Sequence, residues 1–182
     1  MRILPIAYYL HYQKMNDEEI VNLVNNVSSI THAHEISVIG CYIYVRIAMY
    51  LLGGYSKEET YNEIKKIDYS MFKTENLNKY DRILKKDISK EEVDNIKSTG
   101  YIVDTLEAVL WVLFNTYDYN QTIIKAINLG GDTDTIGAIV GGLAGIIYGI
   151  DNINSDWKKD LIKYDYIIKL CEDFDTVISN KF

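Results

Sequence analysis

A single proline, Pro5, occurs in a chain of 182 residues. Proline breaks helix interiors and central strands, so its rarity leaves room for long uninterrupted helices. Apolar residues recur at the 3.6-residue spacing of amphipathic helices along most of the chain. We find no convincing run of the period-two alternation that marks a half-buried strand. The sequence therefore predicts an all-α fold, built as one domain over residues 1–182.

Capping signals mark where several helices begin. Ser56 with Glu59, and Ser89 with Glu92, have the capping-box form of a hydroxyl followed three residues later by a carboxylate. Asn16 precedes three acids that favour a helix N-terminus, and a glycine pair at 53–54 is typical of a helix end. We predict helices over residues 6–14, 17–29, 34–52, 57–66, 90–97, 102–116, 120–128, 135–149 and 157–176, of which the last could be broken. Residues 68–88 are predicted to form a long surface excursion.

The charge and the apolar runs limit the classes of function. A net charge of -7 and a pI near 5.0 disfavour a general nucleic-acid binder, because phosphate binding needs clustered Lys and Arg. Arg46 interrupts the apolar run at 36–52, and the run at 136–150 is too short to span a bilayer. Cys41 and Cys171 lie in apolar helical contexts and are predicted to be buried thiols. We expect a soluble cytoplasmic protein that binds neither nucleic acid nor membrane.

Glycines recur every four residues at 137, 141, 145 and 149, with Gly142 and Ala144 beside them. This spacing places small residues on one ridge of a helix, where another helix can approach closely. Because glycine weakens a helix, the ridge indicates a packing demand. We predict a tightly buried central helix.

Oxygen-bearing side chains precede this helix. Asp132, Asp134 and Thr135 form a compact set of hard oxygen ligands of the kind that suits Mg²⁺, and the glycine pair before them allows a sharp turn with exposed amides. Helix capping by Asp134 or Thr135 is an alternative explanation. An EF-hand is excluded, because Ile136 and Leu143 occupy its fifth and twelfth positions.

Four ordered blocks of the sequence resemble the ADP-ribosylglycohydrolase family, over nearly the whole chain. The most specific block is Asn-Leu-Gly-Gly-Asp-Thr-Asp-Thr at 128–135, followed by glycine-rich residues at 141–145 and 148–149. The others are Met-Arg-Ile-Leu-Pro-Ile at 1–6, Thr-His-Ala-His at 31–34 with residues 37–39 and 41–45, and residues 98–108 with Trp111. The resemblance implies a multi-helix orthogonal bundle around a two-metal Mg²⁺ cleft. It also implies hydrolysis of bonds that join ADP-ribose to protein side chains, or of related ADP-ribose bonds.

The resemblance assigns metal ligands. It makes Asp132, Asp134 and Thr135 half of a binuclear Mg²⁺ site, whose ions would orient the ribose hydroxyls and a water and stabilise an oxocarbenium-like transition state.

The resemblance also assigns substrate contacts. His32 and the backbone around Tyr101 and Ile102 would line the ADP-ribose site, and further contacts are expected from Gly130, Gly131 and Asp104. From the residues alone, other interpretations stay open for some of them. A histidine at a helix start is often a cap, His32 and a second histidine two residues on cannot share a helix face, and Asp104 with Glu107 has capping-box spacing.

Two family motifs do not occur in the sequence: Gly-Asp-Ala-x-Gly and Thr-Asp-Asp. The resemblance places the other metal ligands and the catalytic acid or base in that N-terminal region, so we expect this chain to correspond to the C-terminal portion of the family, without its N-terminal helices. Three functional interpretations follow: a Mg²⁺-dependent hydrolase, a non-catalytic remnant that binds ADP-ribose or a partner, and half of a split enzyme whose N-terminal fragment is encoded separately. A homo-oligomer that covers the exposed apolar face is a further explanation.

Overall fold

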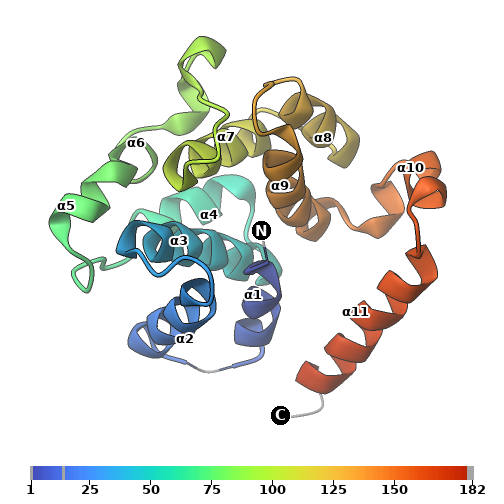
Figure 1. Cartoon of the computed structure of the whole chain (residues 1–182), viewed down its shortest axis with the longest axis horizontal. Coiled ribbons are helices and arrows are strands. Elements are labelled where there is room, and N and C mark those ends of the chain that lie inside the picture. The colour runs from blue at the N-terminus through green and yellow to red at the C-terminus, as the bar shows by residue number, and fades with distance from the viewer. Residues whose placement is uncertain (1, 14, 180–182) are drawn as a thin grey trace.

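The computed structural model describes residues 2–13 and 15–179, and this part of the chain is helical, without strands (Figure 1). The all-α prediction is confirmed. The α-helices are α1 (Leu4–His11), α2 (Asp17–Ser29), α3 (Glu35–Leu52), α4 (Lys57–Ile64), α5 (Thr74–Leu77), α6 (Asp81–Leu84), α7 (Ile102–Phe114), α8 (Tyr119–Ile127), α9 (Thr133–Tyr148), α10 (Ser155–Asp160) and α11 (Tyr164–Ser179). The 3-10 helices are η1 (Asn78–Tyr80), η2 (Ile88–Lys90), η3 (Val93–Asn95) and η4 (Ile150–Asn152).

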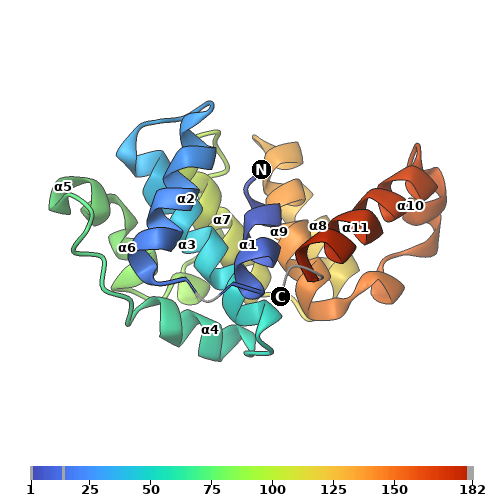
Figure 2. The same cartoon turned by 90° about the horizontal axis from the view of Figure 1, so that it is seen from below.

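Helix α3 lies at the centre of the bundle. It packs against α1, α2, α4, α7 and α9, and Figure 2 shows α5 and α6 on one side of this group and α10 and α11 on the other. By length and composition alone α3 could also cross a membrane, but 56% of it is buried within the chain. The core helix of a water-soluble bundle has the same character.

The predicted helix starts at 17 and 57 are confirmed, and their caps explain them. The Asn16 side chain accepts a hydrogen bond from the Glu19 amide at 3.0 Å, and Glu19 accepts one from the Asn16 amide at 2.8 Å. Ser56 and Glu59 form the same reciprocal pair. Each box satisfies two amides that a helix start would otherwise leave without partners.

The predicted helix over 90–97 is wrong. Ser89 donates its hydroxyl to Asp87 at 2.6 Å, and only the short 3-10 turns η2 and η3 form there. The Glu91 carbonyl instead accepts a hydrogen bond from the Trp111 ring nitrogen at 2.8 Å. In a helix over 90–97 this carbonyl would accept a hydrogen bond from an amide of the same helix. The tertiary contact with Trp111 replaces that bond.

The predicted surface excursion at 68–88 is only partly exposed. It contains α5, η1 and α6, and it buries Tyr80, Ile83 and Ile88 completely. The Tyr80 hydroxyl donates to the Ile36 carbonyl at 2.6 Å. This segment is therefore part of the core that supports α3.

Part of the predicted glycine ridge packs against α8: a Cβ at Gly137 would lie 3.8 Å from the Ile127 side chain. A Cβ at Gly141 would lie 3.0 Å from the Ile123 side chain of α8, whereas one at Gly142 would lie 2.6 Å from the Leu4 side chain of α1. Gly145 faces open space, and Gly149 lies beyond the helix with φ +76°. The predicted ridge therefore forms a helix contact at Gly137 and Gly141 but not at Gly145 and Gly149, and α3 rather than α9 is the central helix.

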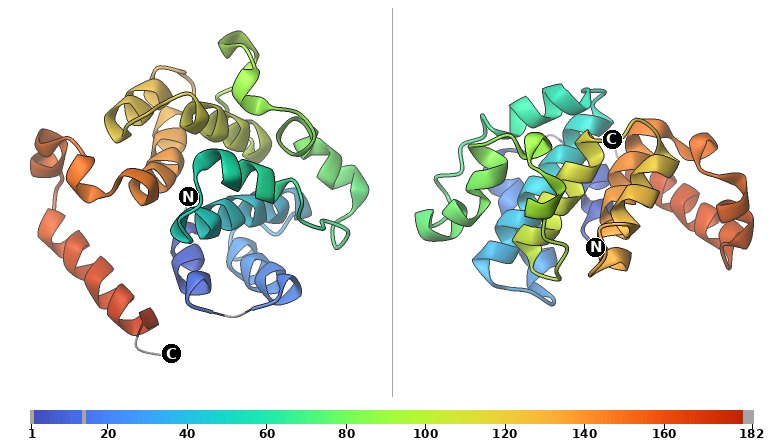
Figure 3. Two further views of the ribbon diagram at one scale, coloured as in Figure 1. Left: turned by 180° about the vertical axis from the view of Figure 1, so that it is seen from behind. Right: turned by 90° about the horizontal axis from the view of Figure 1, so that it is seen from above.

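The C-terminal segment breaks where the pattern allowed it. Helices α10 and α11 are separated by residues 161–163, and α11 lies along the outside of the bundle (Figures 1 and 3). Cys171 on α11 is exposed, which corrects the prediction of a buried thiol, whereas Cys41 on α3 is half-buried. The apolar context of Cys171 in the sequence did not reveal that Ile178 is the one buried residue of α11.

Candidate functional site

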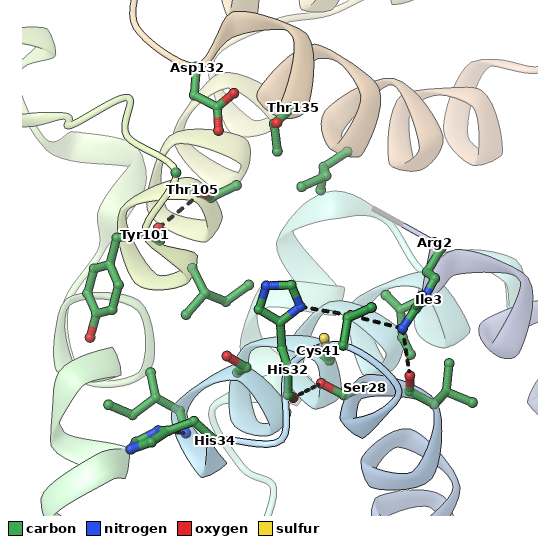
Figure 4. A pocket seen from close by; sticks show the side chains of 17 residues that line it. Arg2, Ile3, Ser28, His32, His34, Cys41, Tyr101, Thr105, Asp132 and Thr135 are labelled. Atoms are coloured by element: carbon green, nitrogen blue, oxygen red, sulfur yellow. Dashed lines mark hydrogen bonds between the residues drawn. The ribbon is translucent and has the colours of Figure 1, made fainter.

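A cavity of about 700 Å³ opens where the chain start, the α2–α3 loop and the starts of α7 and α9 meet (Figure 4). Its volume lies within the range of pockets that hold small organic ligands, about 300–1,000 Å³. It is lined by Arg2, Ile3, Val27, Ser28, Thr31, His32, His34, Ile36, Ser37, Cys41, Gly100, Tyr101, Ile102, Thr105, Asp132, Thr135 and Ile139. Five residues predicted to form a site meet here: His32, Tyr101, Ile102, Asp132 and Thr135.

The start of α9 presents two of the three predicted metal ligands to the cavity. Asp132 is the N-cap residue, but its carboxylate makes no capping hydrogen bond, and the helix begins at Thr133. Asp134 and Thr135 therefore lie inside the first turn, so the alternative explanation that one of them caps the helix is wrong. Asp134 is exposed and does not line the cavity.

The glycine pair before α9 brings two loops into contact. Gly130 and Gly131 have φ of +75° and +64°, and a Cβ at Gly131 would lie 2.0 Å from the Ser98 carbonyl oxygen. That carbonyl accepts a hydrogen bond from the Asp132 amide at 3.1 Å, while the Gly130 amide donates to Ile127 at 3.3 Å. Neither glycine lines the cavity. Their role as ligand contacts stays a prediction; their observed role is to hold Asp132 beside the loop at 98–101.

Asp104 lies in the first turn of α7, just outside the cavity lining. Its carboxylate accepts a hydrogen bond from the Thr99 hydroxyl at 2.7 Å, and Thr99 in turn accepts one from the Tyr101 amide at 3.1 Å. The capping box with Glu107 is wrong, because the N-cap of α7 is Tyr101. Asp104 therefore shapes the loop that carries Tyr101, and direct ligand contact by Asp104 stays a prediction.

The two histidines of the α2–α3 loop both line the cavity, because they lie in a loop and not on a regular helix. His34 caps α3 by accepting a hydrogen bond from the Ile36 amide at 3.2 Å. His32 Nδ1 lies 2.8 Å from the Thr31 hydroxyl, and Thr31 accepts a hydrogen bond from Arg2 at 2.9 Å. Arg2 and Thr31 belong to the family-like blocks, but no sequence pattern indicated a role for either of them.

Cys41 lies deeper in the cavity, beside a small recess of about 40 Å³ that Gly40, Tyr44 and Leu106 help to line. Burial raises the pKa of the Cys41 thiol, and the nearby Ser28 hydroxyl and Arg2 guanidinium offset part of this effect. The thiol form is thereby favoured, so Cys41 is not an activated nucleophile. The exposed lining residues are mostly polar, among them Arg2, Thr31 and His32, whereas Ile3 is buried.

The donor types at α9 fit a hard cation. Asp132 and Thr135 supply a carboxylate and a hydroxyl, and Mg²⁺ readily completes its coordination shell with water. Within residues 2–13 and 15–179 there is no group of three or more His, Cys, Asp or Glu side chains that could hold a metal ion. The chain thus offers a partial ligand set of the right chemistry.

The fold and the cavity define an all-α protein with a nucleotide-sized site edged by a carboxylate and a histidine. The family model for ADP-ribosylglycohydrolase matches residues 1–181, and this chain belongs to that family.

Several known proteins are similar to the chain. It is 32% identical to the ADP-ribosylarginine hydrolase Tri1 of Serratia proteamaculans over 146 residues, which are 80% of this chain and 37% of that one. It is 33% identical to the ADP-ribosyl-[dinitrogen reductase] glycohydrolase of Rhodospirillum rubrum over 132 residues, 72% of this chain and 40% of that one. A solved structure described as an ADP-ribosylglycohydrolase-related protein complex has the same fold, with a TM-score of 0.71 at 22% identity, covering 93% of this chain and 54% of that one. The chain thus spans less than half the length of the two hydrolases.

Proposed function

We propose that the cavity binds ADP-ribose and that this chain takes part in hydrolysing the bond between ADP-ribose and a modified protein side chain. One observation carries the proposal: blocks near residues 2, 32, 101 and 132, far apart in sequence, converge on a single cavity. The family membership of the chain supplies the identity of the ligand.

The lining residues suit the parts of such a ligand. His32 can donate a hydrogen bond to a phosphate or ribose oxygen, and the half-exposed ring of Tyr101 can stack on a base. Ile102 offers an apolar wall. Asp132 and Thr135, with Asp134 beside them, would hold Mg²⁺, which supplies positive charge to stabilise the charge that develops during hydrolysis.

Proton transfer needs a further group. Glycosidic hydrolysis generally uses two carboxyl groups, and Asp132 is the only carboxylate among the described residues that line the cavity. We propose that the acid or base belongs to the part of the family fold that has no counterpart in residues 1–182. Arginine is the first acceptor to assay, because the relative from Serratia proteamaculans is named as an ADP-ribosylarginine hydrolase.

The test is isothermal titration of the purified chain with ADP-ribose, with and without Mg²⁺, together with ADP-ribose release from ADP-ribosylarginine. We expect binding that Mg²⁺ strengthens and that Asp132→Asn weakens about tenfold or more, since a charged contact contributes about 1.5–3 kcal/mol. The matched control is Asp151→Asn, which removes an exposed carboxylate away from the cavity. Absence of ADP-ribose binding, or equal binding by the Asp132 variant, would contradict the proposal.

A second candidate is ADP-ribose binding without turnover. The partial ligand set at α9 and the single carboxylate in the lining favour it. Tight binding with no release would support this candidate. Release only after mixing with the N-terminal portion of a family member, supplied as a separate chain, would support the half-enzyme interpretation.

A further inference from the structure

A chain of hydrogen bonds links the side chain of Arg2 to the ring of His32. Arg2 Nη2 donates to the Val27 carbonyl at 3.2 Å and to Thr31 Oγ1 at 2.9 Å. Thr31 Oγ1 lies 2.8 Å from His32 Nδ1. Arg2, Thr31 and His32 all line the cavity, and Figure 4 shows the imidazole projecting into the space between Tyr101, Asp132 and Arg2.

The chemistry of these three groups favours one direction for the protons. A guanidinium can only donate, so it occupies one lone pair of the Thr31 hydroxyl. That bond draws electron density from Oγ1, which makes the hydroxyl a better donor and a poorer acceptor for its second partner. The Thr31 hydrogen is therefore directed to His32 Nδ1, which must then carry no proton. In a neutral imidazole the single N–H is left on Nε2.

The backbone fixes the position from which this ring extends. The His32 amide donates to the Ser28 carbonyl at 2.8 Å, and the Ser28 hydroxyl donates to the His32 carbonyl at 2.9 Å. Ser28 is buried at the end of α2. His32 is thus held through its backbone by Ser28 and through its ring by Thr31, and a donor on Nε2 faces the cavity from a defined place.

We propose that Arg2 and Thr31 are positioning residues, which hold His32 as the Nε2–H tautomer and so present a fixed hydrogen-bond donor to an oxygen of the bound ligand. The identity of that oxygen, a phosphate or ribose oxygen of ADP-ribose, rests on the proposed function. The tautomer does not, because it follows from contacts within the protein alone.

The tautomer can be read directly from long-range ¹H–¹⁵N spectra of histidine-labelled protein at about pH 9, where imidazoles are neutral. His32→Gln identifies the ring among the three histidines. In the wild type we expect an unprotonated Nδ1 and a protonated Nε2.

Thr31→Val, which keeps the shape of the side chain but removes the hydroxyl, should give the averaged chemical shifts of a mixed tautomer population. Arg2→Met should move the shifts in the same direction. Thr31→Ser should preserve the wild-type shifts, as should the control Thr74→Val, which alters an exposed threonine away from the cavity.

Titration with ADP-ribose then separates the two proposals. Thr31→Val should weaken binding about twofold, because an even mixture leaves about half of the rings with the Nε2–H donor, and Thr31→Ser should restore affinity. A protonated Nδ1 in the wild type, or a spectrum that Thr31→Val leaves unchanged, would overturn the positioning role even if ADP-ribose binds. The expected tautomer in a protein that fails to bind ADP-ribose would uphold the positioning of His32 and reject the proposed ligand.

Discussion

Helices α9 and α11 have the same length, sixteen residues, but opposite relations to the rest of the chain. Helix α9 contains four glycines, each of which costs a helix about 1 kcal/mol relative to alanine, and it is nevertheless packed into the core. Helix α11 contains no glycine, but of its residues only Ile178 is buried. Leu170 and Val177 on α11 are more than half exposed.

The difference shows that packing, rather than intrinsic helix propensity, holds α9 in place. Its glycines at 141 and 142 let α8 and α1 approach on two sides, and the close packing of these helices offsets the lost propensity. Asp132 and Thr135 are carried by this packed helix, so their positions are fixed by the core. The cavity does not involve α11, since none of its residues contributes to the lining.

The largest expected effect comes from the same substitution made in each helix. Leu143 of α9 is fully buried, so Leu143→Ala should lower the free energy of unfolding by about 4 kcal/mol through lost burial and a new cavity. Leu170 of α11 is 55% exposed, and Leu170→Ala should change stability by less than about 0.5 kcal/mol. Urea denaturation of both variants checks the pair.

Similar losses in the two variants would break the comparison. They would show that the apolar face of α11 is covered in solution. Sedimentation of the wild type at two concentrations would then reveal whether a second copy of the chain covers it.

A second pair of variants tests how α9 is joined to the cavity. Gly130 and Gly131 both have positive φ, but only a Cβ at Gly131 would meet backbone, 2.0 Å from the Ser98 carbonyl oxygen. Gly130→Ala should cost about 1–2 kcal/mol of backbone strain, and Gly131→Ala about 3 kcal/mol, because the two loops must also separate. Thermal unfolding gives the ranking. Equal costs would show that the contact with Ser98 is not required.

Features of the fold that depend on neighbouring residues could be predicted from the sequence, whereas features that depend on distant residues could not. The helix starts after Asn16 and Ser56 were predictable because the acids that favour the dipole, and the capping box, each lie within a single helical turn. The failure at Ser89 has the opposite cause: the indole of Trp111, a residue of α7, takes the Glu91 carbonyl. No local sequence pattern can indicate a hydrogen-bond donor that lies so far along the chain.

The site shows the same division. Family-like blocks identified His32, Asp132 and Thr135, which do line one cavity. They did not reveal that Asp134 is exposed and absent from the cavity lining, nor that Arg2 donates a hydrogen bond to Thr31. Both facts depend on the packing of distant elements, since Arg2 and Thr31 are separated by the whole of α1 and α2.

The smallest effect is a difference in pH dependence between a buried and an exposed carboxylate. Glu107 of α7, the helix that packs on α9, is buried and bonded to Arg82 at 2.8 Å. Burial raises the pKa of Glu107, and the Arg82 guanidinium offsets only part of that rise. The folded protein therefore keeps a proton that the unfolded chain loses between the two pKa values. Its stability falls as pH rises through that window, which begins near the ordinary glutamate value of about 4.3.

Glu107→Gln replaces the ionisable carboxyl group with an amide that does not titrate. It should therefore flatten the fall of stability with rising pH. The control Glu172→Gln removes one exposed carboxylate from α11 and should leave the slope as in the wild type. Urea midpoints measured at steps between about pH 4 and pH 7 give the three slopes. If the stabilities of Glu107→Gln and the wild type fall in parallel as pH rises, the burial of Glu107 does not control its protonation. The two carboxylates of α7 and α11 then do not differ in their effect on stability. That result would leave the difference in packing between α9 and α11 untouched.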